Sequence, residues 1–215
     1  MRNQRRYIVV EGPIGVGKTT LAKKLAESFG SQLLLEGAAD NPFLPRFYAN
    51  PRQAALSTQL FFLLQRAQQI QDMRQGELFT PVWVADFLLD KDRLFAELTL
   101  DSDELALYEQ VYQHLTIDAP TPDLVIYLQA PVSVLNERIG NRGVEFEQSI
   151  SREYLQRLSD SYMHFFHHYE RSPLLIVNTE SVNLANNEDD YHLLLDRVNS
   201  ISGGTEYFNP RSFPV

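Results

Sequence analysis

The octapeptide that begins at Gly12 constrains this chain more than any other feature of the sequence. It reads Gly-Pro-Ile-Gly-Val-Gly-Lys-Thr and matches the pattern G-x-x-x-x-G-K-[ST], whose glycines let successive backbone N–H groups turn toward one phosphate. A β-rich apolar run at 6–10 precedes it, and a helical pattern over 18–29 follows. This order predicts a strand, a phosphate-binding loop and a helix whose N-terminus faces an anion. A plain glycine-rich turn explains the same residues less well, because the flanking context also matches.

The loop predicts a nucleoside triphosphate site, ATP or GTP, with a magnesium ion. In such loops the lysine, here Lys18, bridges the β- and γ-phosphates, and the following hydroxyl, here Thr19, binds Mg²⁺. The residues expected to contact the nucleotide are consecutive: Gly12, Pro13, Ile14, Gly15, Val16, Gly17, Lys18, Thr19 and Thr20. The motif alone does not separate a kinase from an ATPase, a GTPase or a motor.

Short apolar runs alternate with long helical patterns along the rest of the chain. The expected strands are 6–10, 32–35, 82–85, 124–128 and 174–177, and the expected helices are 18–29, 52–75, 87–98, 102–115, 132–141, 152–171 and 188–200. This alternation predicts an α/β fold, a parallel sheet of about five strands with helices on both faces. We expect one domain over 1–215, with the tail 203–215 as a non-helical strap or a frayed end.

Composition excludes several classes of protein. Hydrophobic residues make up 44% of the 215 and charged residues 22%, as in an ordinary folded protein. The net charge of -9 argues against a nucleic-acid partner. The N-terminal apolar run is too short for a signal peptide or a membrane span, and the chain has no cysteine. A cytoplasmic protein with no membrane partner is the default expectation.

Five segments, in order, resemble the deoxynucleoside kinase family, and the bacterial deoxyadenosine and deoxyguanosine kinases in particular. They are EGPIGVGKTTLA, LLLEGAADNPFLPRFYANP, TQLFFLLQRAQQ, VWVADFLLDKDRLFAE and YLQAPVSVLNERIGNRGVEFEQSISREYL, and the resemblance as a whole covers 6 to about 180. The resemblance implies a P-loop kinase fold and an enzyme that phosphorylates the 5′-hydroxyl of a deoxynucleoside with MgATP. The product would be the 5′-monophosphate used in nucleotide salvage. A purine deoxynucleoside is the expected acceptor.

The resemblance assigns the catalytic base and the sugar contacts. Glu36, at the end of the second expected strand, would take the proton of the 5′-hydroxyl; a surface glutamate that caps a turn is the alternative. Tyr48 and Glu147 would hold the sugar 3′-hydroxyl, with Tyr48 disfavouring a ribose 2′-hydroxyl. Without the resemblance, Tyr48 reads as a core aromatic residue with a polar tip.

The nucleobase contacts are expected on one helix and its neighbour. Gln59 and Arg66 are seven residues apart and therefore share a helix face. The family pattern adds Asp92, and the three side chains together would bind the base edge. Helix-surface ion pairs are the alternative for Arg66 and Asp92. The amide of Gln59 can serve adenine or cytosine, so the preferred base stays open.

The expected lid, about 138–148, carries Arg138 and Arg142, which would stabilise charge on the transferring phosphoryl group. Simple helix capping by arginine is the alternative. Asp86 is expected to serve Mg²⁺ together with Thr19, directly or through water.

The chain departs from the family pattern at two positions. Phe87 stands where the family has an arginine, so that Arg93 or a lid arginine would have to substitute. An aromatic residue of the base pocket is also one position out of register, at Phe95.

The preferred function is thus a Mg²⁺- and ATP-dependent deoxynucleoside kinase that forms a homodimer. A pyrimidine-preferring kinase, a nucleoside-monophosphate kinase and a non-catalytic P-loop subunit are the alternatives.

Overall fold

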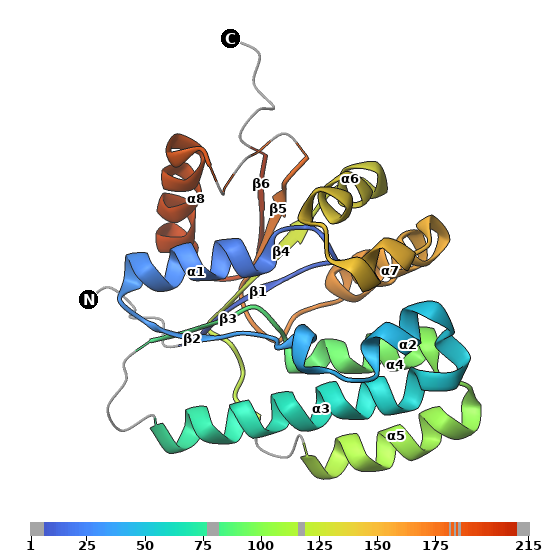
Figure 1. Cartoon of the computed structure of the whole chain (residues 1–215). Coiled ribbons are helices and arrows are strands. Elements are labelled where there is room, and N and C mark those ends of the chain that lie inside the picture. Colours follow the sequence, from blue (N-terminus) through green and yellow to red (C-terminus); the bar gives the residue numbers. More distant parts are fainter. Residues whose placement is uncertain are drawn as a thin grey trace.

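The computed structural model describes residues 7–76, 82–115, 119–180, 182, 184 and 186–209, and within them a parallel six-stranded sheet forms the centre (Figure 1). The strands run in the order β2-β3-β1-β4-β5-β6, and every neighbouring pair is parallel. Their bounds are β1 Tyr7–Glu11, β2 Gln32–Leu34, β3 Trp83–Ala85, β4 Leu124–Gln129, β5 Leu174–Asn178 and β6 Thr205–Phe208. Parallel neighbours require crossover connections, which the helices supply.

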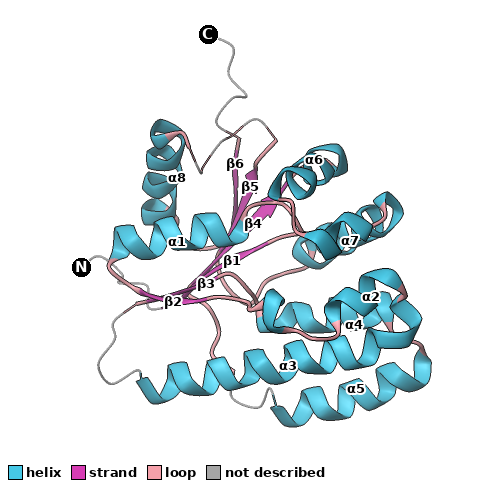
Figure 2. Ribbon diagram, in the orientation of Figure 1, coloured by secondary structure: helices cyan, strands magenta, loops and turns pink. Residues whose placement is uncertain are grey.

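Helices cover both faces of the sheet and extend beyond one edge (Figure 2). The α-helices are α1 Lys18–Phe29, α2 Leu44–Ala49, α3 Pro51–Gly76, α4 Asp92–Thr99, α5 Ser102–Leu115, α6 Val132–Arg142, α7 Arg152–His167 and α8 Glu188–Ser200. Short 3₁₀ turns are η1 Ala38–Asp40, η2 Leu89–Lys91 and η3 Glu145–Ser149. In the part of the chain that the structure describes, no helix is long and apolar enough to cross a membrane.

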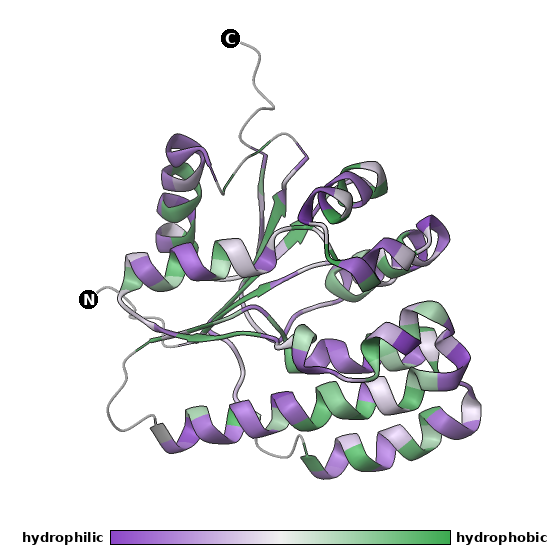
Figure 3. Cartoon of the chain, viewed as in Figure 1, coloured by the Kyte–Doolittle hydropathy of each residue, from purple (hydrophilic) through white to green (hydrophobic). Residues whose placement is uncertain are grey.

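Two hydrophobic layers sandwich the sheet. Side chains of a strand alternate between its faces, so Ile8 and Val10 pack with α1 and α8, whereas Tyr7 and Val9 pack with α3, α4 and α7. Each of these four side chains is buried. Figure 3 shows the strands as hydrophobic along most of their length, while the helices carry polar residues on their outer faces. Burial of one such aliphatic side chain stabilises the fold by about 1.5–3 kcal/mol.

The loop between β1 and α1 depends on glycines at two close approaches. A Cβ atom at Gly12, whose φ is 151°, would lie 2.4 Å from the carbonyl oxygen of Leu128. At Gly15, where φ is 83°, it would lie 2.9 Å from the carbonyl oxygen of Leu135. A side chain at either position would displace the loop from β4 or α6. The glycines of the motif therefore place the loop against the neighbouring elements as well as turning its N–H groups.

The five expected strands are confirmed, and the structure adds a sixth. The tail was expected to be a strap or a frayed end, but Thr205–Phe208 pairs with β5 as an edge strand. The rest of the expected tail, 210–215, lies outside the described residues. The strand was missed because its residues alternate between exposed and half-buried and form no apolar run.

The expected helix 87–98 is wrong at its start. Leu88 is extended, with φ -110° and ψ 126°, because its N–H donates a hydrogen bond of 2.8 Å to Glu11. The chain then forms η2, and α4 begins only at Asp92. The expected helix 152–171 ends at His167, because His168 leaves the helical conformation, with φ -107° and ψ 9°. The short helix α2 had no strong periodic signal and was not expected.

Candidate active site

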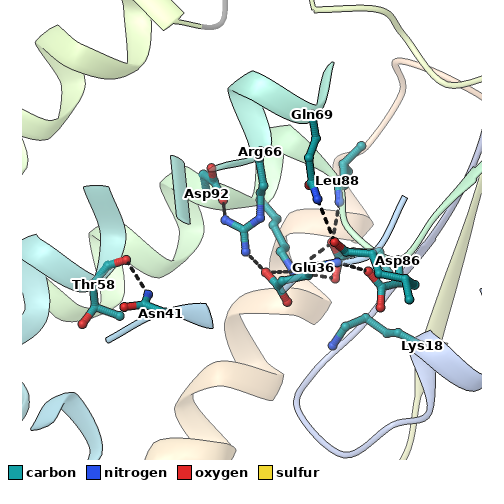
Figure 4. Close-up of polar contacts among 12 residues, drawn as sticks. Lys18, Glu36, Asn41, Thr58, Arg66, Gln69, Asp86, Leu88 and Asp92 are labelled. Carbon is teal, nitrogen blue, oxygen red and sulfur yellow. Dashed lines mark hydrogen bonds and ion pairs between the residues drawn. The ribbon is translucent and has the colours of Figure 1, made fainter. Parts of the chain in front are cut away.

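Polar side chains gather where three adjacent strands end. The phosphate-binding loop follows β1, Glu36 follows β2, and Asp86 follows β3 directly. Because these strands are parallel neighbours, their carboxyl ends lie at one edge of the sheet, where α/β proteins bind ligands. In Figure 4, Glu36 lies between Arg66 and Asp86, and Lys18 reaches toward the same place from α1.

One cavity of about 670 Å³ lies over the N-terminus of α1. The expected nucleotide contacts that line it are Gly15, Val16, Gly17, Lys18, Thr19 and Thr20. Gly12 and Pro13 do not line it; their carbonyl oxygens instead accept hydrogen bonds from Lys18 Nζ, at 2.7 and 3.2 Å. Burial and then the positive charge of Lys91 lower the pKa of Lys18 to about 8. Lys18 remains a cation at neutral pH and could exchange these carbonyls for phosphate oxygens. We call this space the donor cavity.

Arg138 lines the donor cavity but not the neighbouring one. Its guanidinium donates to Val16 O at 3.3 Å, to Thr179 Oγ1 at 3.0 Å and to Thr179 O at 2.6 Å. These bonds join α6 to the phosphate-binding loop and to the segment after β5. Arg142, one turn further along α6, lines both cavities.

Asp86 connects the loop to the end of β2. Its Oδ2 accepts a hydrogen bond of 2.5 Å from the Thr19 hydroxyl, and its Oδ1 accepts one of 2.6 Å from the backbone N–H of Glu36. Burial raises the pKa of Asp86, against the opposing effect of the Thr19 bond. A hydroxyl and a carboxylate oxygen at this separation are hard ligands that fit a magnesium ion beside the loop.

A second cavity of about 350 Å³ lies beside the first, and we call it the acceptor cavity. The expected site residues that line it are Ile14, Gly15, Lys18, Thr19, Glu36, Tyr48, Gln59, Arg66, Asp86, Arg142 and Glu147. Asp92 does not line it, because it lies behind Arg66. The structure thus brings residues from five separate segments around one space, next to the lysine and hydroxyl of the loop.

Glu36 is held from several sides. Its carboxylate forms an ion pair with Arg66 and lies 3.6 Å from the ammonium group of Lys91. The backbone beside it is fixed by α3, since Gln69 Nε2 donates to Leu35 O at 2.9 Å. The side chain is still 17% exposed, so one face of it opens to the acceptor cavity.

Gln59 and Arg66 line the acceptor cavity together, as their spacing on α3 predicted, and both are buried. Arg66 forms an ion pair with Asp92, which is also buried. Within the described protein, Arg66 Nε and Asp92 Oδ2 are buried without a hydrogen-bond partner. Buried polar atoms normally have a partner, so this pair has hydrogen-bonding capacity left for a ligand. Phe95 lines the same cavity, one position from where the family pattern placed an aromatic residue.

Tyr48 and Glu147 also line the acceptor cavity. Tyr48 stacks on Phe146 with ring centroids 6.1 Å apart, and Glu147 is buried. Burial first, and the nearby Tyr154 and Glu147, raise the pKa of Tyr48 well above its usual value. Glu147 accepts a hydrogen bond of 3.0 Å from Arg142 Nε. The expected lid and sugar residues are therefore in direct contact.

Sequence reasoning missed two charged residues and misjudged one. Arg93 does not replace the arginine absent at position 87: it is about half exposed and pairs with Glu109 at 2.7 Å. Phe87 itself is fully buried in the core. The cations that contact Glu36 are Arg66 and the buried Lys91, whose other partner is Glu11. Neither Glu11 nor Lys91 belongs to a motif that assigns it a role. Glu11 gave one signal, a charged residue at the end of an apolar run, whereas Lys91 lies between two aspartates and gave none.

Comparisons with known proteins agree with this architecture. The family profile described as "Deoxynucleoside kinase" matches residues 8–202. A deoxyguanosine kinase of Bacillus subtilis is 35% identical over 208 residues, which cover 93% of this chain and 99% of that protein. A deoxyadenosine kinase of Lactobacillus acidophilus is 30% identical over 85% of this chain and 89% of its own. The solved structure of deoxyadenosine kinase from M. mycoides with bound dCTP matches with a TM-score of 0.78 at 22% identity, over 91% of this chain and all of that one.

Proposed function

The chain belongs to the deoxynucleoside kinase family, and from this premise we propose that it transfers the γ-phosphoryl group of ATP to the 5′-hydroxyl of a purine deoxynucleoside. The observation that carries the proposal is the junction of the two cavities. Lys18, Thr19 and Arg142 line both, while Glu36 lines only the acceptor cavity. A phosphoryl group bound by the loop would therefore face a hydroxyl held near Glu36.

The 5′-oxygen attacks the γ-phosphorus, the bond from that phosphorus to the β–γ bridging oxygen breaks, and ADP leaves. Glu36 accepts the proton of the hydroxyl as the new P–O bond forms. Lys18 and Arg142 lie on the donor side, where they offset negative charge that spreads over the equatorial oxygens. Arg138, held beside Thr179, acts at the edge of the donor cavity.

Thr19 and Asp86 would hold the Mg²⁺ that accompanies ATP, because their oxygens already lie within hydrogen-bonding distance. The ion, when bound, neutralises charge on the β- and γ-phosphates. Asp86 has a second task, since its other carboxylate oxygen fixes the backbone of Glu36.

The protein would select its acceptor through contacts with the base and with the sugar. Gln59 and Arg66, which line the cavity, would bind the edge of a purine whose face rests against Phe95, and Asp92 would hold Arg66 from behind. Tyr48 and Glu147 would bind the 3′-hydroxyl, and the packed ring of Tyr48 leaves little room for a 2′-hydroxyl. The Bacillus subtilis and Lactobacillus acidophilus relatives named above are a deoxyguanosine kinase and a deoxyadenosine kinase, in agreement with this preference.

A nucleoside-monophosphate kinase is a weaker alternative. Its acceptor carries a phosphate, which would require cations free to bind it, whereas Glu36 and Glu147 bring carboxylates to the acceptor cavity. A pyrimidine preference is compatible with the amide of Gln59 and is decided by experiment. The homodimer and the cytoplasmic location remain predictions.

The test measures ADP formation with MgATP and each of the four deoxynucleosides, with the matching ribonucleosides and nucleoside monophosphates beside them. We expect deoxyguanosine and deoxyadenosine to give the highest kcat/KM. Phosphorylation of monophosphates alone would support the alternative kinase class, and ATP binding without transfer to any acceptor would support a non-catalytic subunit.

A further inference from the structure

Lys91 is the most deeply buried lysine in the part of the chain that the structure describes, with 1% of its side chain exposed. Taking an ammonium group out of water is unfavourable unless it is paired with an anion. Both carboxylate oxygens of Glu11 lie 3.3 Å from Lys91 Nζ, and Glu36 Oε1 lies 3.6 Å away. The ring of Phe95 is 5.5 Å from the same nitrogen. Lys91 lines neither cavity, so it contacts Glu36 from behind.

Glu11 is a fixed partner for this lysine. Its side chain is fully buried and accepts hydrogen bonds from Gly12 N at 2.8 Å, Leu88 N at 2.8 Å and the Tyr162 hydroxyl at 3.0 Å. These donors belong to the phosphate-binding loop, the segment after β3 and α7. A carboxylate held from three elements gives Lys91 one rigid anchor, and through Lys91 the position of Glu36 is tied to the loop.

Together with Arg66 and Asp92 these residues form a line of alternating charge: Glu11, Lys91, Glu36, Arg66 and Asp92. Other charged groups near Glu36 are Asp86, which binds its backbone, and Lys18, which lines the same cavity. Glu36 is the only carboxylate of the line that opens to the acceptor cavity, and it is held by a cation on each side.

We propose that Lys91 is a positioning residue, which holds the carboxylate of Glu36 at the junction of the two cavities. The role assigned to Lys91 rests on the proposed function of Glu36 as general base. Arg66 alone would draw that carboxylate toward the nucleobase end, because Arg66 is itself anchored there by Asp92. Lys91 pulls from the side of the loop, so that Glu36 stays between the sugar and the γ-phosphate.

The test is a double-mutant cycle on kcat and acceptor KM. The variants are Lys91→Met, Glu36→Gln, the pair combined, and Lys91→Arg, each assayed with deoxyguanosine at saturating MgATP well below its melting temperature. A base misplaced by about 1 Å can cost about 10²-fold, so Lys91→Met should lower kcat by about 10–10²-fold with little change in KM. In the Glu36→Gln background the same change should have almost no effect, and Lys91→Arg should recover most of the loss.

An equal loss from Lys91→Met in both backgrounds, or an unchanged kcat beside a lower melting temperature, would overturn the role. Should Lys91→Met not fold, Lys91→Gln keeps a hydrogen-bond donor between the two carboxylates and completes the cycle. A different result would contradict the proposed function itself. If the wild-type protein phosphorylates no deoxynucleoside, both the kinase function and the positioning role of Lys91 are wrong. If Glu36→Gln has a normal kcat, Glu36 is not the general base, and the positioning role of Lys91 is wrong as well.

Discussion

The donor and acceptor cavities adjoin each other but are built in opposite ways. Seven consecutive residues, from Gly15 to Leu21, line the donor cavity, and most of what they offer is backbone N–H and one helix N-terminus. The acceptor cavity takes its lining from α2, α3, η3 and the ends of β2 and β3, which are far apart along the chain. Half of the donor lining thus comes from one continuous segment, with Arg138 and Arg142 of α6 among the rest, whereas the acceptor lining is assembled from many segments.

The difference extends to electrostatics. Among the described residues, the hydrogen bonds of Lys18, the main cation of the donor cavity, go to backbone carbonyls, so its charge is available for an anion. In the acceptor cavity the charges are already paired, since Arg66 contacts Glu36 and Asp92. A highly charged ligand is bound by available charge, and a neutral nucleoside by pre-arranged hydrogen-bonding groups. Substitutions in the two cavities should therefore fail in different ways.

The largest effect is expected in the donor cavity, from Lys18→Ala. Removing a cation that acts on the transferring phosphoryl group costs about 10³–10⁵-fold in phosphoryl transfer, so kcat/KM should fall by that order while the fold persists. The matched control is Lys23→Ala, on the exposed side of the same helix. Near-normal turnover of Lys18→Ala, measured by ADP release, would contradict the assignment of the loop.

Glu36→Gln should give the next largest effect and should alter kcat rather than KM. The amide preserves the shape and can still bind the 5′-hydroxyl but cannot accept its proton, so kcat should drop by about 10²–10⁴-fold. Glu27→Gln, an exposed change on α1, is the control. An unchanged kcat would move the role of base to Asp86, which also lines the acceptor cavity.

The contrast between the cavities also explains what the sequence could predict. The donor residues were found from a contiguous motif, because backbone geometry at a β1–α1 turn is set locally. The roles of Glu36, Tyr48, Gln59, Arg66 and Glu147 were predicted through resemblance to a family. Spacing alone placed Gln59 and Arg66 on one face of α3 and gave no partner for the others.

Lys91 shows why the other charged residues near Glu36 could not be predicted from the sequence. Between Asp90 and Asp92, in a segment expected to be helical from residue 87, it looked like an ordinary surface lysine. The actual path is an extended Leu88 followed by η2, and this path turns Lys91 into the core. Glu11 causes that path by binding Leu88, so one buried carboxylate determines both the local backbone and the burial of its own partner.

Base recognition should be intermediate in size and should appear as a change in KM. Gln59→Leu removes an amide that would bind the base edge, a contact worth about 1–3 kcal/mol, so kcat/KM should fall by about 5–150-fold. The control is Gln68→Leu, on the exposed face of the same helix. Equal losses for all four deoxynucleosides would mean that Gln59 supports the cavity without reading the base.

The smallest effect should come from the sugar end and should depend on one acceptor hydroxyl. Tyr48→Phe keeps the ring stacked on Phe146 and removes only the phenolic hydroxyl. If that hydroxyl binds the 3′-hydroxyl, the loss is one hydrogen bond, about 0.5–1.5 kcal/mol or roughly 2–12-fold in kcat/KM with deoxyadenosine. The same substitution should have no effect with 2′,3′-dideoxyadenosine, which lacks the partner.

Discrimination against ribonucleosides should respond differently to substitutions of Tyr48, because it depends on the volume of the Tyr48 ring and not on its hydroxyl. Tyr48→Phe should leave the ratio of kcat/KM between deoxyadenosine and adenosine close to its wild-type value, whereas Tyr48→Ala should bring the ratio closer to one. A wild-type protein that uses adenosine and deoxyadenosine equally well would remove Tyr48 from this role.

The dideoxynucleoside gives the control for the Tyr48 hydroxyl. If Tyr48→Phe loses as much activity with 2′,3′-dideoxyadenosine as with deoxyadenosine, the hydroxyl of Tyr48 orders Glu147 or Arg142 and does not bind the sugar. Activity would then depend on contacts between protein side chains in the acceptor cavity, whereas in the donor cavity it depends on direct contacts with the phosphates. That result would strengthen the contrast between the two cavities.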